Sequence, residues 1–446
     1  MMKILCVSLG CDKNLVDTEK MLGILRAEGY TFTDDETEAE IILVNTCCFI
    51  GDAKEESINT ILELGQLKES GNCRALIVAG CLAQRYRTEI MEEMPEVDAC
   101  VGTTAYDEIA RVIRETLEGK KEMCFADVDR LCGTKASRIV TTGGHYAFLK
   151  IAEGCDKHCA YCVIPKVRGR YRSVPMEELV EEAGELAKAG VRELILVAQE
   201  TTVYGVDLYG EKMLPKLLHE LCGVGGIQWI RILYCYPEEI TMELIQAVKS
   251  EPKVCHYLDI PIQHASDRIL KRMGRRTNQR QLKEIIGLLR REIPDIVLRT
   301  TLISGFPGET KEDHEILMDF VNEMEFERLG VFAYSQEEDT PAAGFEDQVE
   351  DEVKESRRQE LMELQQDISL EGSKAMEGRV LEVLIEGKVA DENVYVGRAY
   401  MDAPSVDGLV FVNTDETLMS GDFVKVQVTG ALEYDLIGEI YDESAK

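Results

Sequence analysis

Three closely spaced cysteines form the segment of this chain with the most evident chemistry. Cys155, Cys159 and Cys162 stand in EGCDKHCAYCVIP, a C-x3-C-x2-C pattern. A 4Fe-4S cluster is normally held by four cysteine thiolates, so three would leave one iron open to bind a substrate. Zinc is the alternative, but zinc sites take four ligands and pair two short-spaced ligands with a distant second pair. The spacing therefore favours an open iron-sulfur cluster.

A second group of cysteines follows strand-like segments near the start of the chain. Between residues 3 and about 119, short β-branched runs alternate with amphipathic helices, which predicts a doubly wound parallel sheet. Cys11, Cys47 and Cys81 come at the carboxyl ends of three of these strands, the edge where ligands bind in such sheets. A buried structural thiol is the usual role of any single cysteine. The repeated placement nevertheless predicts a second cluster, again one ligand short.

Cys48 makes the middle ligand of this group ambiguous. Successive residues of a strand point to opposite faces, so only one of Cys47 and Cys48 can face the site. We favour Cys47.

The middle of the chain repeats strand-helix units at longer spacing. Six such units lie between residues 141 and 371, which predicts a (β/α) TIM-type barrel or a large part of one. Barrel enzymes place their sites at the carboxyl ends of the strands. The polar or glycine-rich residues expected there are Gln199, Glu200, Gln263, His264, Gly305, Phe306, Pro307, Gly308 and Glu309.

The last part of the chain changes to short strands separated by turn residues. Five strands within residues 373–446 predict a small closed antiparallel β-barrel of the oligonucleotide-binding type. The charged, helix-periodic segment 349–372 before it is interpreted as a solvated connecting helix. Residues 120–140 have mixed charge and no clear period, which suits a linker.

Composition places limits on location and partners. Fifteen cysteines without a secretory leader, and no apolar stretch near the ~20 residues of a membrane span, predict a soluble cytoplasmic protein with no membrane contact. The formal charge of −33 disfavours nucleic acid as the main partner and suits a basic protein. The negative charge could also serve solubility alone, and the charge by itself does not distinguish between a basic partner and solubility.

The three-cysteine loop after a strand resembles the radical S-adenosylmethionine (radical SAM) superfamily. The order of modules resembles one group within it, the methylthiotransferase family, with a cluster-binding N-terminal domain, a radical SAM barrel and a C-terminal TRAM barrel. SLGCDKNLVDTE (8–19), NTC (45–47) and AGC (79–81) match the N-terminal cysteine motifs of that family. The corresponding domains would be residues 1–125, 141–371 and 373–446.

The resemblance implies two 4Fe-4S clusters, S-adenosylmethionine and an external electron donor. One cluster would be held by Cys155, Cys159 and Cys162, and the other by Cys11, Cys47 and Cys81. The segment Gly305–Glu309, together with Gln199, would line the S-adenosylmethionine. Reductive cleavage of the sulfonium would give a deoxyadenosyl radical, which can abstract hydrogen from an unactivated carbon.

Three further stretches resemble the branch of the family that modifies a ribosomal protein. They are VAQETTVYGVDLYG (197–210), WIRILYCYP (229–237) and YLDIPIQHASDRILKRM (257–273). The implied reaction adds a methylthio group to the β-carbon of an aspartate in small-subunit ribosomal protein number twelve. A methylene group beside a carboxylate is neither acidic nor electrophilic enough for polar chemistry, so a radical is required.

Two alternatives remain at this point. A transfer-RNA adenosine methylthiotransferase would share the same motifs, but residues 373–446 hold six Lys or Arg against fifteen Asp or Glu, a net charge of −9 that suits RNA poorly. An iron-sulfur carrier or scaffold would give the large barrel no role. We therefore expect a basic ribosomal protein as substrate and no direct binding of nucleic acid.

The cysteine loop is locally basic within an acidic chain. Its cations are Lys157, Lys166, Arg168, Arg170 and Arg172. They could hold the carboxylate of a ligand or favour a reduced cluster, or they could be exposed loop cations without a role. His158 is assigned no ligand role, because a solvated loop histidine is equally plausible.

Overall fold

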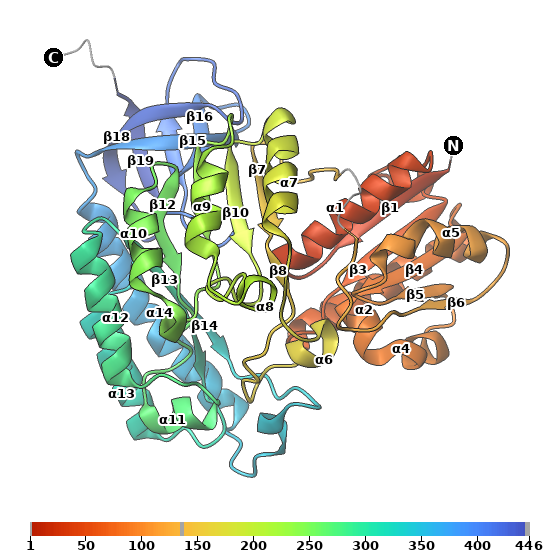
Figure 1. Cartoon of the computed structure of the whole chain (residues 1–446), viewed down its shortest axis with the longest axis horizontal. Coiled ribbons are helices and arrows are strands. Elements are labelled where there is room, and N and C mark those ends of the chain that lie inside the picture. The colour runs from red at the N-terminus through yellow and green to blue at the C-terminus, as the bar shows by residue number, and fades with distance from the viewer. Residues whose placement is uncertain (1, 134–137, 442–446) are drawn as a thin grey trace. The chain divides into compact units, whose positions relative to one another are not determined.

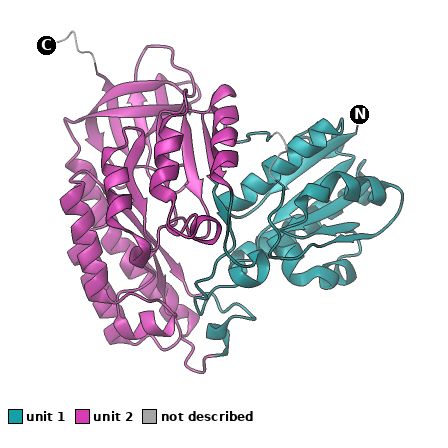
Figure 2. Ribbon diagram, viewed as in Figure 1, with its two compact units in different colours: residues 1–141, 150–174, 335–344 teal, residues 142–149, 175–334, 345–446 magenta. Residues whose placement is uncertain are grey.

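The computed structural model describes residues 2–133 and 138–441, and these form two compact units (Figure 2). Unit 1 consists of residues 1–141, 150–174 and 335–344; unit 2 consists of residues 142–149, 175–334 and 345–446. The cysteine loop thus belongs to unit 1, with the N-terminal sheet. The expected linker 120–140 and the expected last domain 373–446 reach into residues 134–137 and 442–446, which lie outside the described residues.

Unit 1 is built on a six-stranded sheet of order β2-β1-β3-β4-β5-β6, and every pairing is parallel (Figure 1). The order changes direction at β1, which has β2 on one side and β3 on the other, so the sheet is doubly wound as predicted. Its strands are β1 (Lys3–Ser8), β2 (Thr31–Phe32), β3 (Ile41–Thr46), β4 (Ala75–Gly80), β5 (Ala99–Val101) and β6 (Glu122–Cys124). Its helices are α1 (Asp12–Ala27), α2 (Gly51–Gly65), α3 (Leu67–Ser70), α4 (Cys81–Glu93) and α5 (Ile109–Leu117).

The central strands of this sheet are buried on both faces, as their apolar sequences require. All six residues of β3 and all six of β4 are buried. Alternate side chains serve different faces: Ile41 packs with residues of α1 and α5, whereas Ile42 packs with residues of α2 and α4. Apolar residues of α6 (Ile164–Arg168), the helix that follows the cysteine loop, join the α2 and α4 side.

Unit 2 contains a second six-stranded sheet, of order β7-β10-β11-β12-β13-β14. The strand order follows the chain order, the register pairs from β10 to β14 are parallel, and the two edge strands do not pair with each other. The sheet is therefore the large part of a barrel. Its strands are β7 (Tyr146–Lys150), β10 (Glu193–Val197), β11 (Trp229–Ile232), β12 (Val254–Asp259), β13 (Val297–Ser304) and β14 (Arg328–Ala333).

Helices follow these strands in alternation, as the periodicity predicts. They are α7 (Met176–Lys188), α8 (Val206–Tyr209), α9 (Leu214–Cys222), α10 (Met242–Ser250), α11 (Asp267–Arg272), α12 (Gln279–Glu292) and α13 (Lys311–Met324). The charged segment expected to be a solvated connector is helix α14 (Asp351–Lys374). It differs from that expectation because it packs against β14 and α13 and buries Leu361 and Gln365.

The C-terminal strands close into a five-stranded barrel, β15-β16-β17-β19-β18. Four of its pairings are antiparallel, and the pairing of β17 with β19 is parallel. The strands are β15 (Val380–Lys388), β16 (Val394–Ala399), β17 (Val410–Asn413), β18 (Phe423–Ala431) and β19 (Leu436–Ile440). The small closed barrel predicted from the sequence is thus confirmed, with one parallel pair added.

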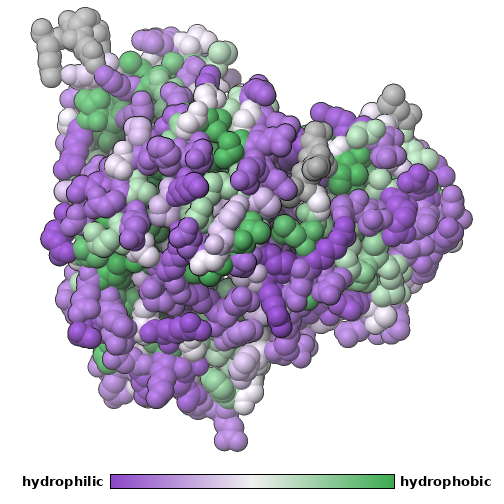
Figure 3. Space-filling view, viewed as in Figure 1, coloured by the Kyte–Doolittle hydropathy of each residue, from purple (hydrophilic) through white to green (hydrophobic). Residues whose placement is uncertain are grey.

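Short elements were harder to predict from pattern. Strand β6 lies inside the segment expected to be a linker, because a three-residue edge strand gives too few residues for a period. On the face drawn in Figure 3, hydrophilic residues predominate and hydrophobic residues form separate small patches, in keeping with the net charge of −33.

A buried ion network joins the C-terminal barrel to the large sheet within unit 2. Glu193 of β10 accepts hydrogen bonds from Arg231 of β11 (2.8 Å) and from Arg398 of β16 (2.6 Å), and all three side chains have no exposed surface. Burial alone would raise the pKa of Glu193, but the two guanidinium groups outweigh it and lower that pKa. Each charge is therefore compensated inside the protein.

Arg398→Met should destabilise unit 2, because it leaves the Glu193 carboxylate buried with one cation fewer. Breaking a buried ion pair from one side costs about 3–5 kcal/mol, so the urea midpoint of unfolding should fall clearly. Arg280→Met, which removes an exposed partner of Glu284, is the matched control and should leave the midpoint near that of the wild type. Equal midpoints for the two variants would show that the network contributes no stability.

Candidate functional site

The three N-terminal cysteines lie where neighbouring strands end. Cys11 is the N-cap of α1 shortly after β1, Cys47 follows β3 directly, and Cys81 is the first residue of α4 after β4. Strands β1, β3 and β4 are adjacent in the sheet. The site therefore falls at the switch point of the strand order, where open α/β sheets bind ligands.

Two glycines make close approach of these segments possible. Gly10 has φ +85°, and a Cβ there would lie 2.5 Å from Cβ and 2.7 Å from Sγ of Cys47. Gly80 has φ +92°, and its Cβ would lie 2.3 Å from Oδ1 of Asn45. A larger residue at either position would be strained in its backbone and would displace the cysteine-bearing segments.

The three thiols are near enough to influence one another electrically. Burial raises the pKa of Cys47 to about 12, with further upward contributions from Cys81 and Cys11. Burial also raises the pKa of Cys81, while attraction to and a hydrogen bond with Arg168 oppose the shift. Cys11 and Cys81 stand at helix N-termini, where the helix dipole favours negative charge. The arrangement suits a ligand set that becomes anionic when metal binds.

Cys48 occupies a different environment from Cys47. It has no exposed surface and belongs to the apolar cluster beneath α2 and α4, and its carbonyl oxygen accepts a hydrogen bond from Arg85 (3.2 Å). After burial, the largest contributions to the raised pKa of Cys47 come from Cys81 and Cys11, whereas those to the pKa of Cys48 come from Cys81 and Arg85. This supports Cys47 as the site residue, which stays a prediction.

The cysteine loop is closed at its neck by a short antiparallel pair. Strands β8 (Ala152–Glu153) and β9 (Arg172–Ser173) pair, and the amide of Cys155 donates to the carbonyl of Gly169 (3.1 Å). Gly154, with φ +76°, packs so tightly that a Cβ would lie 2.0 Å from the carbonyl oxygen of Arg170. The loop is thus an excursion held at both ends.

Within the loop the cysteines gather into one group. Cys155 and Cys159 are buried, and the amide of Cys162 donates to the carbonyl of Cys159 (3.0 Å). Burial raises the pKa of Cys162, and the thiols of Cys159 and Cys155 add to the shift. His158, by contrast, is exposed with φ +52°, which gives no support for a ligand role.

Both sets of thiols fit a four-iron cluster in their donor chemistry. No three His, Cys, Asp or Glu side chains of the described ranges are placed to hold one metal ion. That arrangement is not what a four-iron cluster needs, because each of its cysteines binds a different iron. Each site offers three soft thiolate donors, which are the ligands that such a cluster takes. In the N-terminal site, two of the three, Cys11 and Cys81, stand at helix N-termini.

The glycine-rich segment of unit 2 is a turn between β13 and α13. Gly305 and Gly308 have φ of +68° and +83°, and Phe306 is fully buried against Tyr334, with ring centroids 5.3 Å apart. The space that a Cβ of Gly305 would need is taken by the side chain of Lys354, so the glycine is required by packing. Pro307 lies in the same turn, and its carbonyl accepts from Arg272 (3.1 Å).

Glu309 holds this turn from within. Its Oε2 accepts from the amides of Gly305 (2.8 Å) and Phe306 (3.3 Å), and its Oε1 accepts from Arg357 (2.8 Å). His264 lies 3.4 Å away through Nε2, while its Nδ1 accepts from two amides at 2.9 Å. An accepting Nδ1 requires the proton on Nε2, which faces Glu309 without forming a hydrogen bond to it. The turn is a rigid, preformed element.

The remaining strand-end residues keep their expected places. Gln199 and Glu200 follow β10, and Gln263 follows β12 with φ +70° and a bridge to Leu302 of β13. A positive φ at a residue other than glycine costs free energy and is concentrated at functional sites. A role for Gln199 in binding a cofactor remains a prediction.

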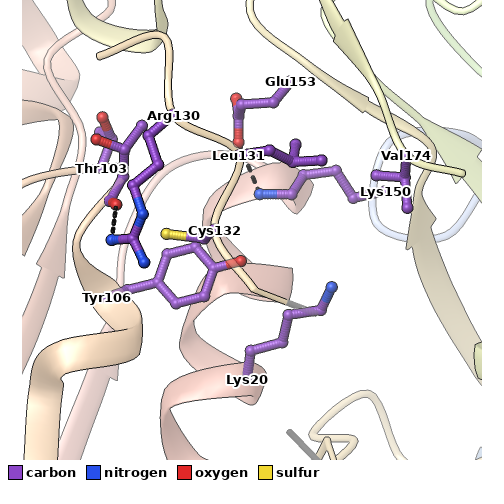
Figure 4. Close-up of a pocket in the computed structure, with 10 residues that line it drawn as sticks. Lys20, Thr103, Tyr106, Arg130, Leu131, Cys132, Lys150, Glu153 and Val174 are labelled. Atoms are coloured by element: carbon purple, nitrogen blue, oxygen red, sulfur yellow. Dashed lines mark hydrogen bonds and ion pairs between the residues drawn. The ribbon is translucent and has the colours of Figure 1, made fainter. Parts of the chain in front are cut away.

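The sequence did not single out four buried polar residues beside the thiols. They are Asn14, Asp17, Lys150 and Glu153. Figure 4 shows Lys150 pointing at Glu153 (2.7 Å) next to a small pocket that Tyr106 and Cys132 also line. Helical spacing was the available signal, since Asn14 lies three residues after Cys11 and Asp17 three residues further on the same helix.

Family models match three successive parts of the chain. Residues 3–102 match uncharacterized protein family UPF0004, residues 149–321 match the radical SAM superfamily, and residues 378–440 match the TRAM domain. The fold and site therefore define a radical SAM protein with a flavodoxin-like N-terminal sheet and a TRAM barrel.

Curated relatives narrow this class to one family. A protein of Lachnoclostridium phytofermentans named ribosomal protein uS12 methylthiotransferase RimO is 65% identical over 98% of this chain and 99% of its own length. Relatives of the same name from Acetivibrio thermocellus and Clostridioides difficile are 52% and 49% identical, each over 100% of this chain and 99% and 100% of their own. The chain belongs to the ribosomal protein uS12 methylthiotransferase family.

Solved structures agree with the fold. The radical S-adenosylmethionine methyltransferase TsrM from Kitasatospora setae gives a TM-score of 0.55 at 14% identity, covering 88% of this chain and 79% of that one. The cobalamin-dependent radical enzyme OxsB gives 0.53 at 13% identity, covering 81% and 56%. At such identities the likeness concerns architecture alone.

Among the helices of residues 2–133 and 138–441, none is long and apolar enough to cross a membrane.

Replacing Cys47 and Cys48 one at a time should separate ligand from core residue. Cys47→Ala should lose one cluster's worth of iron and sulfide from the reconstituted protein, because Cys47 lies against Gly10 and beside Cys11 and Cys81. Cys48→Ala should keep both clusters and lose only some stability. Chemical iron and sulfide analysis decides between them, and the reverse result would move the ligand by one position.

Proposed function

We propose that this protein is an S-adenosylmethionine-dependent methylthiotransferase that adds a methylthio group to the β-carbon of an aspartate in ribosomal protein uS12. The observation that carries this proposal is the full-length likeness to relatives with that name, at up to 65% identity. The catalytic parts of the proposal are supported by two separate groups of three cysteines in one compact unit.

Two 4Fe-4S clusters fit the thiol groups. Cys155, Cys159 and Cys162 would hold one, and Cys11, Cys47 and Cys81 the other. When bound, clusters of this kind supply an electron for cleavage of S-adenosylmethionine and an open iron for sulfur. The protein's part is to bury most of these thiols and to leave each set one ligand short of closure.

S-adenosylmethionine would be held by the strand-end residues of unit 2. We assign this role to the turn Gly305–Glu309 and to Gln199, which follow strands of the same sheet at their carboxyl ends. The turn is fixed by Glu309, which is itself held by Arg357, so its backbone groups need no rearrangement before binding. Residues 1–125, 141–371 and 373–446 remain the proposed functional domains.

The partners follow from charge. The acidic last domain suits a lysine- and arginine-rich ribosomal protein and repels a phosphate backbone, so we propose no direct binding of nucleic acid. We also propose an external electron donor and, because the substrate is a ribosomal protein, a reaction in the cytoplasm.

Removing the two groups of cysteines should have different consequences. Replacing Cys155, Cys159 and Cys162 together by Ala should abolish anaerobic formation of deoxyadenosine, because the cluster proposed to deliver the electron to S-adenosylmethionine is then absent. Replacing Cys11, Cys47 and Cys81 should leave that formation in place and stop sulfur insertion into uS12. Liquid chromatography of deoxyadenosine and intact-mass analysis of uS12 measure the two steps.

Folding of both variants is checked by circular dichroism, and the remaining cluster by its iron content. An N-terminal variant that kept its full iron content and still modified uS12 would disprove the second site. Failure of the wild type to change the mass of uS12 would disprove the proposed substrate.

The C-terminal barrel should bind the substrate through its acidic residues. Glu433→Lys with Glu439→Lys reverses two exposed carboxylates there and should weaken binding of uS12 without changing deoxyadenosine formation. Glu181→Lys with Glu185→Lys on α7 reverses two exposed carboxylates elsewhere in unit 2 and is the matched control. Binding is titrated at several salt concentrations.

Wild-type affinity for uS12 should fall as salt rises, since exposed charges are screened. Equal losses in both double variants would mean that net charge alone matters. Tight, salt-sensitive binding of transfer RNA by the wild type would favour a transfer-RNA substrate and contradict the proposal.

A further inference from the structure

The basic residues of the cysteine loop do not share one environment. Arg168, the last residue of α6, has a side chain that is only 1% exposed, whereas those of Lys166 and Arg170 are 60% and 84% exposed. Exposed loop cations can be present for solubility, but a buried guanidinium needs partners to offset its desolvation. Arg168 therefore has a role inside unit 1.

One edge of the Arg168 guanidinium is neutralised by carboxylates. Its Nη1 donates to Asp17 (2.6 Å) and to Glu153 (3.0 Å), and Lys150 donates to the same two carboxylates. Two cations and two carboxylates make a neutral quartet. Burial alone would raise the pKa of Glu153, but Arg168 and Lys150 outweigh it and lower that pKa, so the carboxylate is charged.

The other edge of the guanidinium faces the N-terminal cysteines. Its Nη2 donates to Oδ1 of Asn14, and Sγ of Cys81 lies 3.9 Å from the same oxygen. Cys81 and Cys11 both contribute to the raised pKa of Arg168, although burial acts against it. The cation is thus shared between the quartet and the thiols.

Asn14 connects Arg168 to the ends of two strands. Its Nδ2 donates to the carbonyl of Leu9 (3.0 Å) and to the carbonyl of Thr46 (2.8 Å), the residue before Cys47. Since Oδ1 is taken by Arg168 and Cys81, this fully buried amide touches the segments of all three N-terminal cysteines. Arg168 fixes the orientation of that amide.

We propose that Arg168 is a positioning residue of the N-terminal cysteine site, where its buried guanidinium orients Asn14 and places positive charge beside Cys81, and so raises the reduction potential of the cluster held there. The inference rests on the proposed function for the presence of that cluster. Reduction adds negative charge, which a nearby cation and hydrogen bonds to sulfur stabilise. The loop that carries Cys155, Cys159 and Cys162 thereby also supplies the cation of the other site.

The test uses the full-length reconstituted protein with both clusters, titrated potentiometrically and followed by electron paramagnetic resonance. The cluster signals are assigned with the two triple cysteine variants. Arg168→Met removes the charge and the hydrogen-bond donors while keeping an unbranched side chain, and it should shift the N-terminal cluster to a more negative potential. Arg168→Lys keeps the charge and should restore most of that potential. Lys166→Met, an exposed cation of the same helix, is the control and should change nothing.

Asp17→Asn gives a prediction of opposite sign. It removes one carboxylate from the quartet at nearly constant shape, so the net charge near Cys81 becomes more positive and the potential should rise. A purely structural ion pair would not move the potential in opposite directions in the Arg168 and Asp17 variants.

Unchanged potentials in Arg168→Met and Asp17→Asn, with iron content retained, would overturn the proposal. Loss of the N-terminal iron from Arg168→Lys as well as from Arg168→Met would also overturn it, because it would show that Arg168 is needed only for assembly. A wild type that binds one cluster only would instead contradict the proposed function and its ligand set, which separates the two failures.

Discussion

Charge buried beside thiols is the physical constraint on which unit 1 depends. Lys150, Arg168, Asp17 and Glu153 are each at most 7% exposed, and an uncompensated charge at such a depth would be strongly destabilising. All four lie in unit 1, on α1, on α6 and on the segment from Lys150 to Glu153 that includes the short strand β8. The quartet can therefore form only when these parts of unit 1 are packed together, so the cysteine loop and the first helix assume their positions together.

The same constraint explains why the segments that carry the N-terminal cysteines are held in fixed positions. Helix N-termini at Cys11 and Cys81 favour negative charge, and glycines at positions 10 and 80 let the segments approach more closely than side chains would allow. Asn14 then uses its amide to connect backbone carbonyls, a thiol and the guanidinium of Arg168. Ligand positions and counter-charge are supplied by one hydrogen-bonded network.

Unit 2 also contains buried charges that need compensation, and it compensates them with different residues. Glu193 is paired with Arg231 and Arg398 where the C-terminal barrel meets the large sheet, and Glu309 is paired with Arg357 at the glycine-rich turn. Glu193 thereby links strands that are distant in sequence, whereas Glu309 links its own turn to Arg357 of α14. For a methylthiotransferase, rigid elements of this kind keep reactive groups in fixed positions, which is the protein's main contribution when a cofactor supplies the chemistry.

Sequence alone determined the modules, because hydrophobic periodicity and cysteine spacing are local properties. These local patterns predicted the six strand-helix units and the five short strands of the last barrel. They also predicted the strands before Cys11, Cys47 and Cys81 and the loop from Cys155 to Cys162. Local pattern was too weak to predict the three-residue strand β6, and it did not reveal that α14 packs against β14.

Only the tertiary structure decided which cation of the cysteine loop is buried, because the sequence contains no difference in residue type between Arg168 and Arg170, two positions apart. Their difference arises because partners 151 and 154 residues away, Asp17 and Asn14, reach one guanidinium and not the other.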